Sequence, residues 1–91
     1  MAIIYEWDDE KAAANLAKHD VTLSDAEGFD WTSSKTIFDA AHSDAENRFL
    51  TYGFIDARLH VMYWTPRGER VRIIGLRKAN SREVKAYAQK T

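Results

Sequence analysis

Residues 48–78 decide the fold, and they read RFLTYGFIDARLHVMYWTPRGERVRIIGLRK. Aromatic and β-branched residues dominate this stretch, which is typical of β-strands. Two turn signals, at residues 56–57 and 66–69, divide it into three runs: 48–55, 58–65 and 70–78. We therefore predict three consecutive strands joined by short turns, and strands joined in this way pair antiparallel.

The flanking segments complete the predicted fold. Before the three strands the sequence predicts a short strand at 3–7, a helix from Asp8 to about Lys18, a shorter helix from Thr22 to about Phe29, and a strand at 35–39; a last helix follows, from Asn80 or Ser81 to about Gln89. Residues 1–91 are expected to form one α+β domain. Its antiparallel sheet has four to five strands, with two N-terminal helices, one C-terminal helix, and the helices mostly on one face.

The second of the two turns predicts how its strands pair. A two-residue turn at Arg67-Gly68 would place Arg58 opposite Arg77 and His60 opposite Gly75 on one face of the sheet. Like charges that face each other cost stability, so a bound phosphate between the arginines would relieve this arrangement. The missing side chain of Gly75 would leave space for a ligand to approach.

Charge is divided along the chain. Residues 1–46 carry three lysines and eleven acids, a net charge of −8, whereas residues 47–91 carry ten cations and three acids, a net charge of +7. Such asymmetry is a hint of a nucleic acid or another acidic partner. It is equally compatible with two halves that meet and neutralise each other, and charge alone does not decide between these readings.

Several classes of protein are excluded by what the sequence lacks. Without cysteine there is no disulfide and no thiolate chemistry, which fits a reducing compartment. No apolar run approaches the roughly 18 residues of a membrane span, and the N-terminus does not resemble a signal peptide, so we expect a cytoplasmic protein. There is no phosphate-binding loop or zinc-protease motif, and the three histidines are scattered. We expect no metal and no cofactor.

The remaining chemistry consists of arginine, lysine, histidine and a few carboxylates. This set suffices to cleave RNA by attack of its own 2′-hydroxyl, because the substrate then supplies the nucleophile. Arginine binds phosphate oxygens with two parallel hydrogen bonds, and Tyr63 and Trp64 are able to stack on unpaired bases. Lys11, Asn15 and Lys18 share one helix face, which is either a solvated surface or part of a site.

Two blocks of residues resemble the BrnT family of bacterial toxins. The N-terminal block contains Tyr5-Glu6-Trp7-Asp8, Lys11, Asn15, Lys18-His19, Val21, Leu23, Ala26 and Phe29-Asp30. The C-terminal block contains Arg72-Ile73-Ile74-Gly75-Leu76-Arg77-Lys78-Ala79, Arg82-Glu83 and Tyr87. Arg48, Gly53 and Arg67 match between the blocks, so that the resemblance covers nearly the whole chain.

The resemblance implies a RelE-like fold and a metal-independent endoribonuclease that arrests growth. It implies a partner, the DNA-binding antitoxin BrnA, and a toxin–antitoxin complex that reaches operator DNA only through the antitoxin. The site that it implies contains His19, Arg67, Arg72, Arg77 and Lys78. We expect further RNA contacts from Lys18, Arg48, Arg58, His60 and Arg70.

Two departures from the family pattern keep other functions open. Gly75-Leu76 stands where the family usually has small residues, and Leu76 is bulkier than the family residue. Asp20 replaces a glycine beside His19, where an acid would favour the protonated imidazole. A catalytically weak relative that binds its antitoxin and helps to repress the operon is therefore the alternative function. A general RNA-binding domain is a third candidate, and it predicts binding that weakens steadily with salt.

Overall fold

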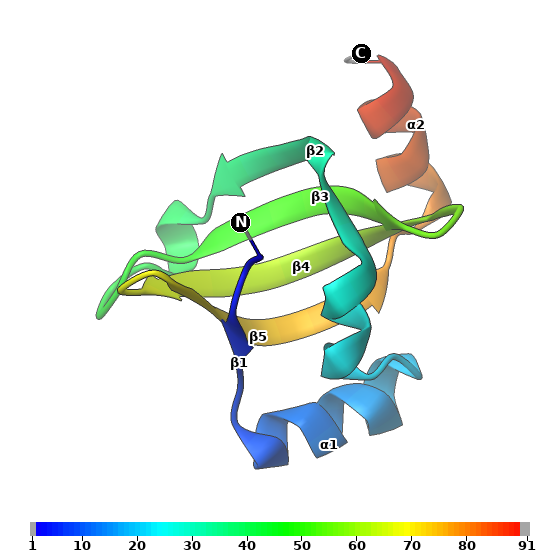
Figure 1. The fold of residues 1–91 in the computed structure, drawn as a ribbon. Helices are drawn as coiled ribbons and strands as arrows, with labels where there is room; N and C mark the ends of the chain where they lie inside the picture. The colour runs from blue at the N-terminus through cyan, green and yellow to red at the C-terminus, as the bar shows by residue number, and fades with distance from the viewer. Residues whose placement is uncertain (1, 90–91) are drawn as a thin grey trace.

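The three predicted central strands form in this computed structural model, which describes residues 2–89 (Figure 1). They are β3 (Phe49–Ile55), β4 (Arg58–Arg67) and β5 (Arg70–Lys78). Asp56 and Ala57 make the two-residue turn between β3 and β4, and Asp56 adopts a left-handed backbone with φ of 53°. The strands and their antiparallel pairing are as predicted.

The complete sheet is mixed rather than antiparallel. Its five strands lie in the order β1-β5-β4-β3-β2, where β1 is Tyr5–Glu6 and β2 is Phe29–Phe38. β1 runs parallel to β5 and pairs only with Val71 and Arg72, which corrects the prediction of an all-antiparallel sheet. β2 begins six residues earlier than predicted. Its first half is mostly polar and contains an irregularity in the strand pairing between Asp30 and Lys35, so this part lacks the sequence pattern of a strand.

The predicted register of β4 against β5 is wrong, although the strands pair antiparallel as predicted. Arg67 pairs with Arg70, so that the turn residues are Gly68 and Glu69, and Gly68 takes the positive φ of 60° that suits the first turn position. A further shift occurs between Tyr63 and Trp64. In consequence Arg77 lies opposite Val61 and Gly75 lies opposite Tyr63, so the expected pairs Arg58–Arg77 and His60–Gly75 do not form.

Both α-helices begin where their capping residues predict. α1 (Asp9–His19) is capped by the Asp8 side chain, and α2 (Ser81–Gln89) follows a reciprocal pair in which the backbone N–H groups of Asn80 and Glu83 each donate to the other's side chain. The second predicted helix is a 3-10 helix, η1 (Leu23–Gly28), and a shorter one, η2 (Ala40–His42), precedes β3.

Each face of the sheet buries its own apolar cluster. One cluster joins Met62, Ile73 and Leu76 of the sheet to Val21, Leu23, Ala26 and Phe29. The other joins Leu59, Val61 and Ala79 to Tyr87 of α2 and to the sheet aromatics Tyr52, Phe54 and Tyr63. The helices are therefore divided between the two faces, unlike the predicted arrangement. α1 lies beside β5, and α2 stands near the end of the sheet where β3 turns into β4 (Figure 1).

Candidate active site

A buried asparagine attaches α1 to the edge of β5. The Asn15 side-chain amide donates to the carbonyl oxygens of Leu76 (2.8 Å) and Val21 (2.9 Å), and its oxygen accepts from the N–H of Leu76 (3.1 Å). Asn15 is the one buried side chain of α1. Because Lys11 and Lys18 lie four residues before and three residues after it, they share its helix face.

Beside this attachment, a basic cavity of about 400 Å³ lies between α1, β4 and β5 and is open to solvent. Gly75 lies opposite Tyr63 and belongs to its wall, where a Cβ atom would come within 3.4 Å of the Asn15 oxygen. The cavity therefore brings cations from both ends of the chain together. Its lining residues are Lys11, Ala14, Asn15, Lys18, His19, Tyr63, Ile74, Gly75 and Arg77.

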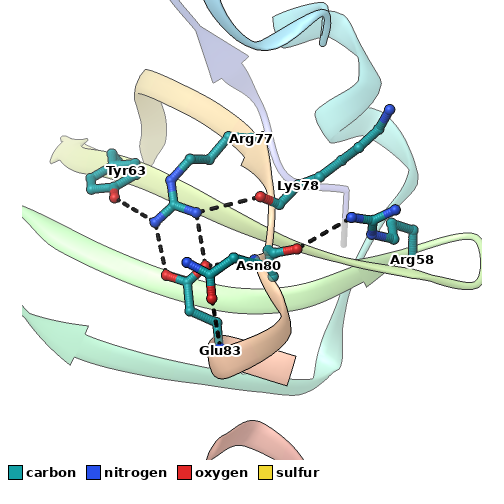
Figure 2. A network of polar contacts seen from close by, with 7 residues as sticks. Arg58, Tyr63, Arg77, Lys78, Asn80 and Glu83 are labelled. Atoms are coloured by element: carbon teal, nitrogen blue, oxygen red, sulfur yellow. Dashed lines mark hydrogen bonds and ion pairs between the residues drawn. The ribbon is translucent and has the colours of Figure 1, made fainter. Parts of the chain in front are cut away.

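Arg77 is held by a carboxylate of α2 (Figure 2). Its two terminal nitrogens each lie 2.8 Å from an oxygen of Glu83, and one of them also donates to the Tyr63 hydroxyl at 3.1 Å. The Glu83 contact raises the pKa of Arg77, and Arg77 in turn lowers the pKa of Glu83. Arg77 is therefore a permanent cation, and the Glu83 carboxylate occupies both of its terminal nitrogens.

His19 is the histidine of the cavity. Burial, together with the positive charges of Lys18 and Arg77, lowers the pKa of its imidazole below the ordinary value of 6.5. The expectation that Asp20 favours the protonated form is wrong, because Asp20 ends α1 in a left-handed conformation with φ of 57° and does not contribute to this shift. At neutral pH the imidazole is thus uncharged and able to accept a proton.

Three of the other predicted arginines lie at the turn between β4 and β5, where acids of the first half of the chain neutralise them. Arg67 contacts Glu46 at 3.1 Å. Arg72 contacts Glu6 at 2.8 Å, and Arg70 lies 3.7 Å from the same carboxylate. Part of the charge asymmetry of the sequence is thus balanced within the fold, and none of these arginines lines the basic cavity.

The remaining predicted residues lie apart from the cavity. Lys78 extends away from Arg77 (Figure 2) and pairs with His60, a buried residue whose Nδ1 lies 2.9 Å from the carbonyl oxygen of Arg58. The Arg58 guanidinium donates to the carbonyl oxygen of Ala79 at 3.3 Å. Arg48 precedes β3, and its N–H donates to the Ser43 hydroxyl. Of the expected set, only Lys18, His19 and Arg77 line the basic cavity.

Comparison with known proteins assigns the chain to a family. A family model described as the ribonuclease toxin BrnT of a type II toxin–antitoxin system matches residues 7–83. The chain belongs to the BrnT family. This match includes α1, with Lys11 and His19, and β5, with Arg77, so that it spans both sides of the cavity.

A crystal structure of a BrnT protein supports the same assignment. The ribonuclease toxin BrnT of Brucella abortus, solved at 1.1 Å resolution, is 27% identical in sequence and superposes with a TM-score of 0.67. The superposition covers 89% of this chain and 99% of the Brucella chain. No curated protein matches the sequence.

The cavity also contains residues that the sequence analysis did not place in a BrnT site. Lys11 and Asn15 are two of these residues, and their spacing with Lys18 on one helix face is the sequence signal that joins them to the site. Glu83 stands three residues after Asn80, a capping-box spacing, which predicts a helix start and not an ion pair with Arg77. The described part of the chain has no group of three or more His, Cys, Asp or Glu residues that could hold a metal ion. Among residues 2–89, no helix is both long and apolar enough to cross a membrane.

Proposed function

We propose that this member of the BrnT ribonuclease toxin family cleaves RNA in the basic cavity without a metal ion, and that this cleavage arrests growth. The observation that carries the proposal is the convergence of Lys11, Lys18, His19 and Arg77 on one cavity with the Tyr63 hydroxyl. This set is able to bind a phosphodiester, neutralise the charge that grows on its oxygens, and move two protons.

The proposed reaction uses the 2′-hydroxyl of RNA as its nucleophile. The neutral imidazole of His19 accepts the 2′-hydroxyl proton, and the 2′-oxygen attacks phosphorus to form a 2′,3′-cyclic phosphate. The 5′-oxygen leaves with the hydroxyl proton of Tyr63. Until this step the proton is available, because the Tyr63 oxygen serves as the acceptor in its hydrogen bond with Arg77. Lys11 and Lys18 bind the phosphate oxygens, and Arg77 stabilises their charge.

This proposal is narrower than the set of residues expected from the sequence. Arg67, Arg72 and Lys78 lie outside the cavity and receive no catalytic role. Arg77→Ala and Lys18→Ala are expected to lower RNA cleavage by about 100-fold or more, since each removes charge stabilisation at the phosphate. Arg67→Ala is expected to change cleavage by less than about 3-fold, because Arg67 is an exposed member of a surface ion pair with Glu46.

The experiment that tests the function is expression of the chain with and without its antitoxin. Growth arrest, and cleavage of purified RNA in the presence of a chelator, are the expected results for the chain alone, whereas Arg77→Ala should restore growth. Lys85→Ala, which removes an exposed cation of α2 outside the cavity, is the matched control. A wild-type chain that neither slows growth nor cuts RNA would overturn the proposal.

The type II family implies an antitoxin partner. We propose that this partner is a BrnA-like DNA-binding protein, that the hetero-oligomer reaches operator DNA through it, and that the complex acts in the cytoplasm. We also propose that the fold belongs to the RelE-like group that the resemblance implies. Co-purification with the product of the neighbouring gene, followed by an operator-binding assay, tests the partner.

One observation favours a second candidate function. Glu83 occupies both terminal nitrogens of Arg77, and Tyr63 accepts a further hydrogen bond from one of them. If this arginine stays neutralised when RNA binds, the chain would be a catalytically weak toxin that serves as an antitoxin-binding co-repressor. A stable complex with operator binding, and no RNA cleavage by the free chain, would favour this function over the ribonuclease.

A further inference from the structure

The edge of β5 is completed by a side chain. β1 ends at Glu6 and pairs only with the first part of β5, so that it does not reach Leu76. There the Asn15 amide accepts from the backbone N–H of Leu76 and donates to its carbonyl oxygen, as a residue of a neighbouring strand would do. The side chain of Asn15 is only 7% exposed, and its third hydrogen bond goes to Val21.

This contact sets the position of α1 more than apolar packing does. The helix buries no apolar side chain: Ala12 is half-buried and Leu16 is 45% exposed. Asn15 also touches the one residue that directly precedes Arg77 in the sequence. The hydrogen bonds between Asn15 and Leu76 therefore fix both the position of α1 along β5 and its rotation about the helix axis.

Rotation of α1 decides what faces the cavity. Lys18 and His19 follow Asn15 by three and four residues, so they project from the same side of the helix as the amide. The two cations and the imidazole of α1 are consequently directed at Arg77 only while the amide stays paired with Leu76. Asn15 and Leu76 are 61 residues apart, which makes this the contact that joins the two ends of the site.

We propose that Asn15 is a positioning residue of the ribonuclease site, and that its amide, paired with the backbone of Leu76, holds Lys18 and His19 opposite Arg77. This inference rests on the proposed function. A positioning role differs from a purely stabilising one. Substitution of a residue that only stabilises the fold would lower the fraction of folded molecules but leave the geometry of their site unchanged.

The test uses two substitutions of Asn15 and one control. Asn15→Gln keeps both donors and the acceptor but is longer by one methylene group, so it displaces α1 from β5 by about 1 Å, and a displacement of that size costs about 100-fold in rate. Asn15→Ser keeps a hydrogen-bonding oxygen and leaves the gap unfilled. Thr65→Val is the control, since it removes one buried hydrogen bond, to Asn47, at a β4 residue that does not line the basic cavity.

Cleavage of a short RNA and titration of the His19 ring by NMR are measured on all four chains. We expect kcat to fall by about 100-fold in N15Q with KM within about 3-fold, because the phosphate-binding lysines remain and only the transition-state geometry is lost. The pKa of His19 is expected to rise towards its ordinary value in both Asn15 variants, because burial and the charge of Arg77 both lower it in the intact site. T65V should match the wild type in both measurements.

Two outcomes would overturn the inference. One is a loss of kcat in T65V equal to that in N15Q, which would assign the effect to stability. The other is an unchanged His19 titration in both Asn15 variants. If the wild-type chain cuts no RNA, the proposed function fails, but the inference about Asn15 is still tested. The His19 titration in the two variants then decides whether Asn15 holds α1 in place against β5.

Discussion

Replacement of Glu83 by glutamine separates the charge of the Arg77–Glu83 pair from its hydrogen bonds. The amide oxygen of Gln keeps the capping contact with the Asn80 N–H and the contact with one terminal nitrogen of Arg77, but the negative charge is lost. The two side chains are only 23% and 17% exposed, so solvent screens their attraction only in part. The attraction of such a pair is about 4 kcal/mol at intermediate polarity, and desolvation offsets most of it. We expect a net loss of about 1–2 kcal/mol in the free energy of unfolding at pH 7.

The sign of the pH dependence follows from the lowered pKa of Glu83. Because Arg77 lowers this pKa below its ordinary value of 4.5, the pair stabilises the fold above pH 4.5. This contribution is lost as the pH falls through the lowered pKa, where the folded carboxyl becomes protonated. Urea denaturation of the wild type and E83Q should therefore show a difference at pH 7 that is absent well below pH 4.5. Glu69→Gln is the control, because Glu69 is an exposed turn residue that forms no salt bridge with any residue of the described chain, 2–89.

The same substitution tests how Arg77 meets RNA. In E83Q the guanidinium charge is no longer balanced, so a non-cleavable oligonucleotide should bind more tightly, and its affinity should depend more steeply on salt, by about 0.7 in the logarithmic slope for one additional phosphate contact. Weaker binding with an unchanged salt slope would refute the idea that Glu83 neutralises the arginine of the cavity. A stability loss equal to that of E69Q, or one that persists at low pH, would refute the energetic argument.

Three further predictions follow from single contacts. The rate constant kcat/KM for RNA cleavage should rise with pH through the lowered pKa of His19 and then level off, and His19→Gln should remove this rise; a rise that persists in H19Q would exclude His19 as the base. Gly53→Ala should lower the free energy of unfolding by about 2–3 kcal/mol, because its Cβ would lie 2.5 Å from the Phe29 ring, whereas Gly28→Ala, with its nearest neighbour at 3.7 Å, is the tolerated control in the same denaturation assay. Trp64→Phe should cost about 1 kcal/mol, since it removes the indole hydrogen bond to Thr51 at 2.8 Å; thermal melts that show no loss would contradict this value.

The sequence predicts those strands whose pattern is local. Aromatic and β-branched residues with a two-residue turn suffice for β3 and β4, and Asp8 suffices for the start of α1. The pairing of β5 was not predictable in this way, because Gly68 rather than Arg67 begins the turn and the irregularity at Trp64 has no sequence signal. A shift of this kind changes which side chains share a face.

The site was partly predictable for a related reason. Arg77, Lys18 and His19 were recognised from charge and from the resemblance, but the number of basic residues does not tell which of them are already neutralised. Glu6 reaches Arg72 across 66 residues of sequence, and Glu46 reaches Arg67 across 21. Such ion pairs depend on strand neighbours, so that only the folded chain separates the arginines of the turn from the arginine of the cavity.

The attachment of α1 to β5 by Asn15 has a practical consequence for the intact toxin. The two sides of the basic cavity come from residues 9–19 and 70–78. A fragment that ends before β5 or begins after α1 therefore carries only half of the site. A cut in the segment between η2 and β3 would divide the chain into two such halves, neither of which holds a complete site. Their reassembly along the β2–β3 ladder would rebuild the site and, with it, the proposed cleavage, which makes this fold suited to a split enzyme whose activity reports that two fused proteins have met.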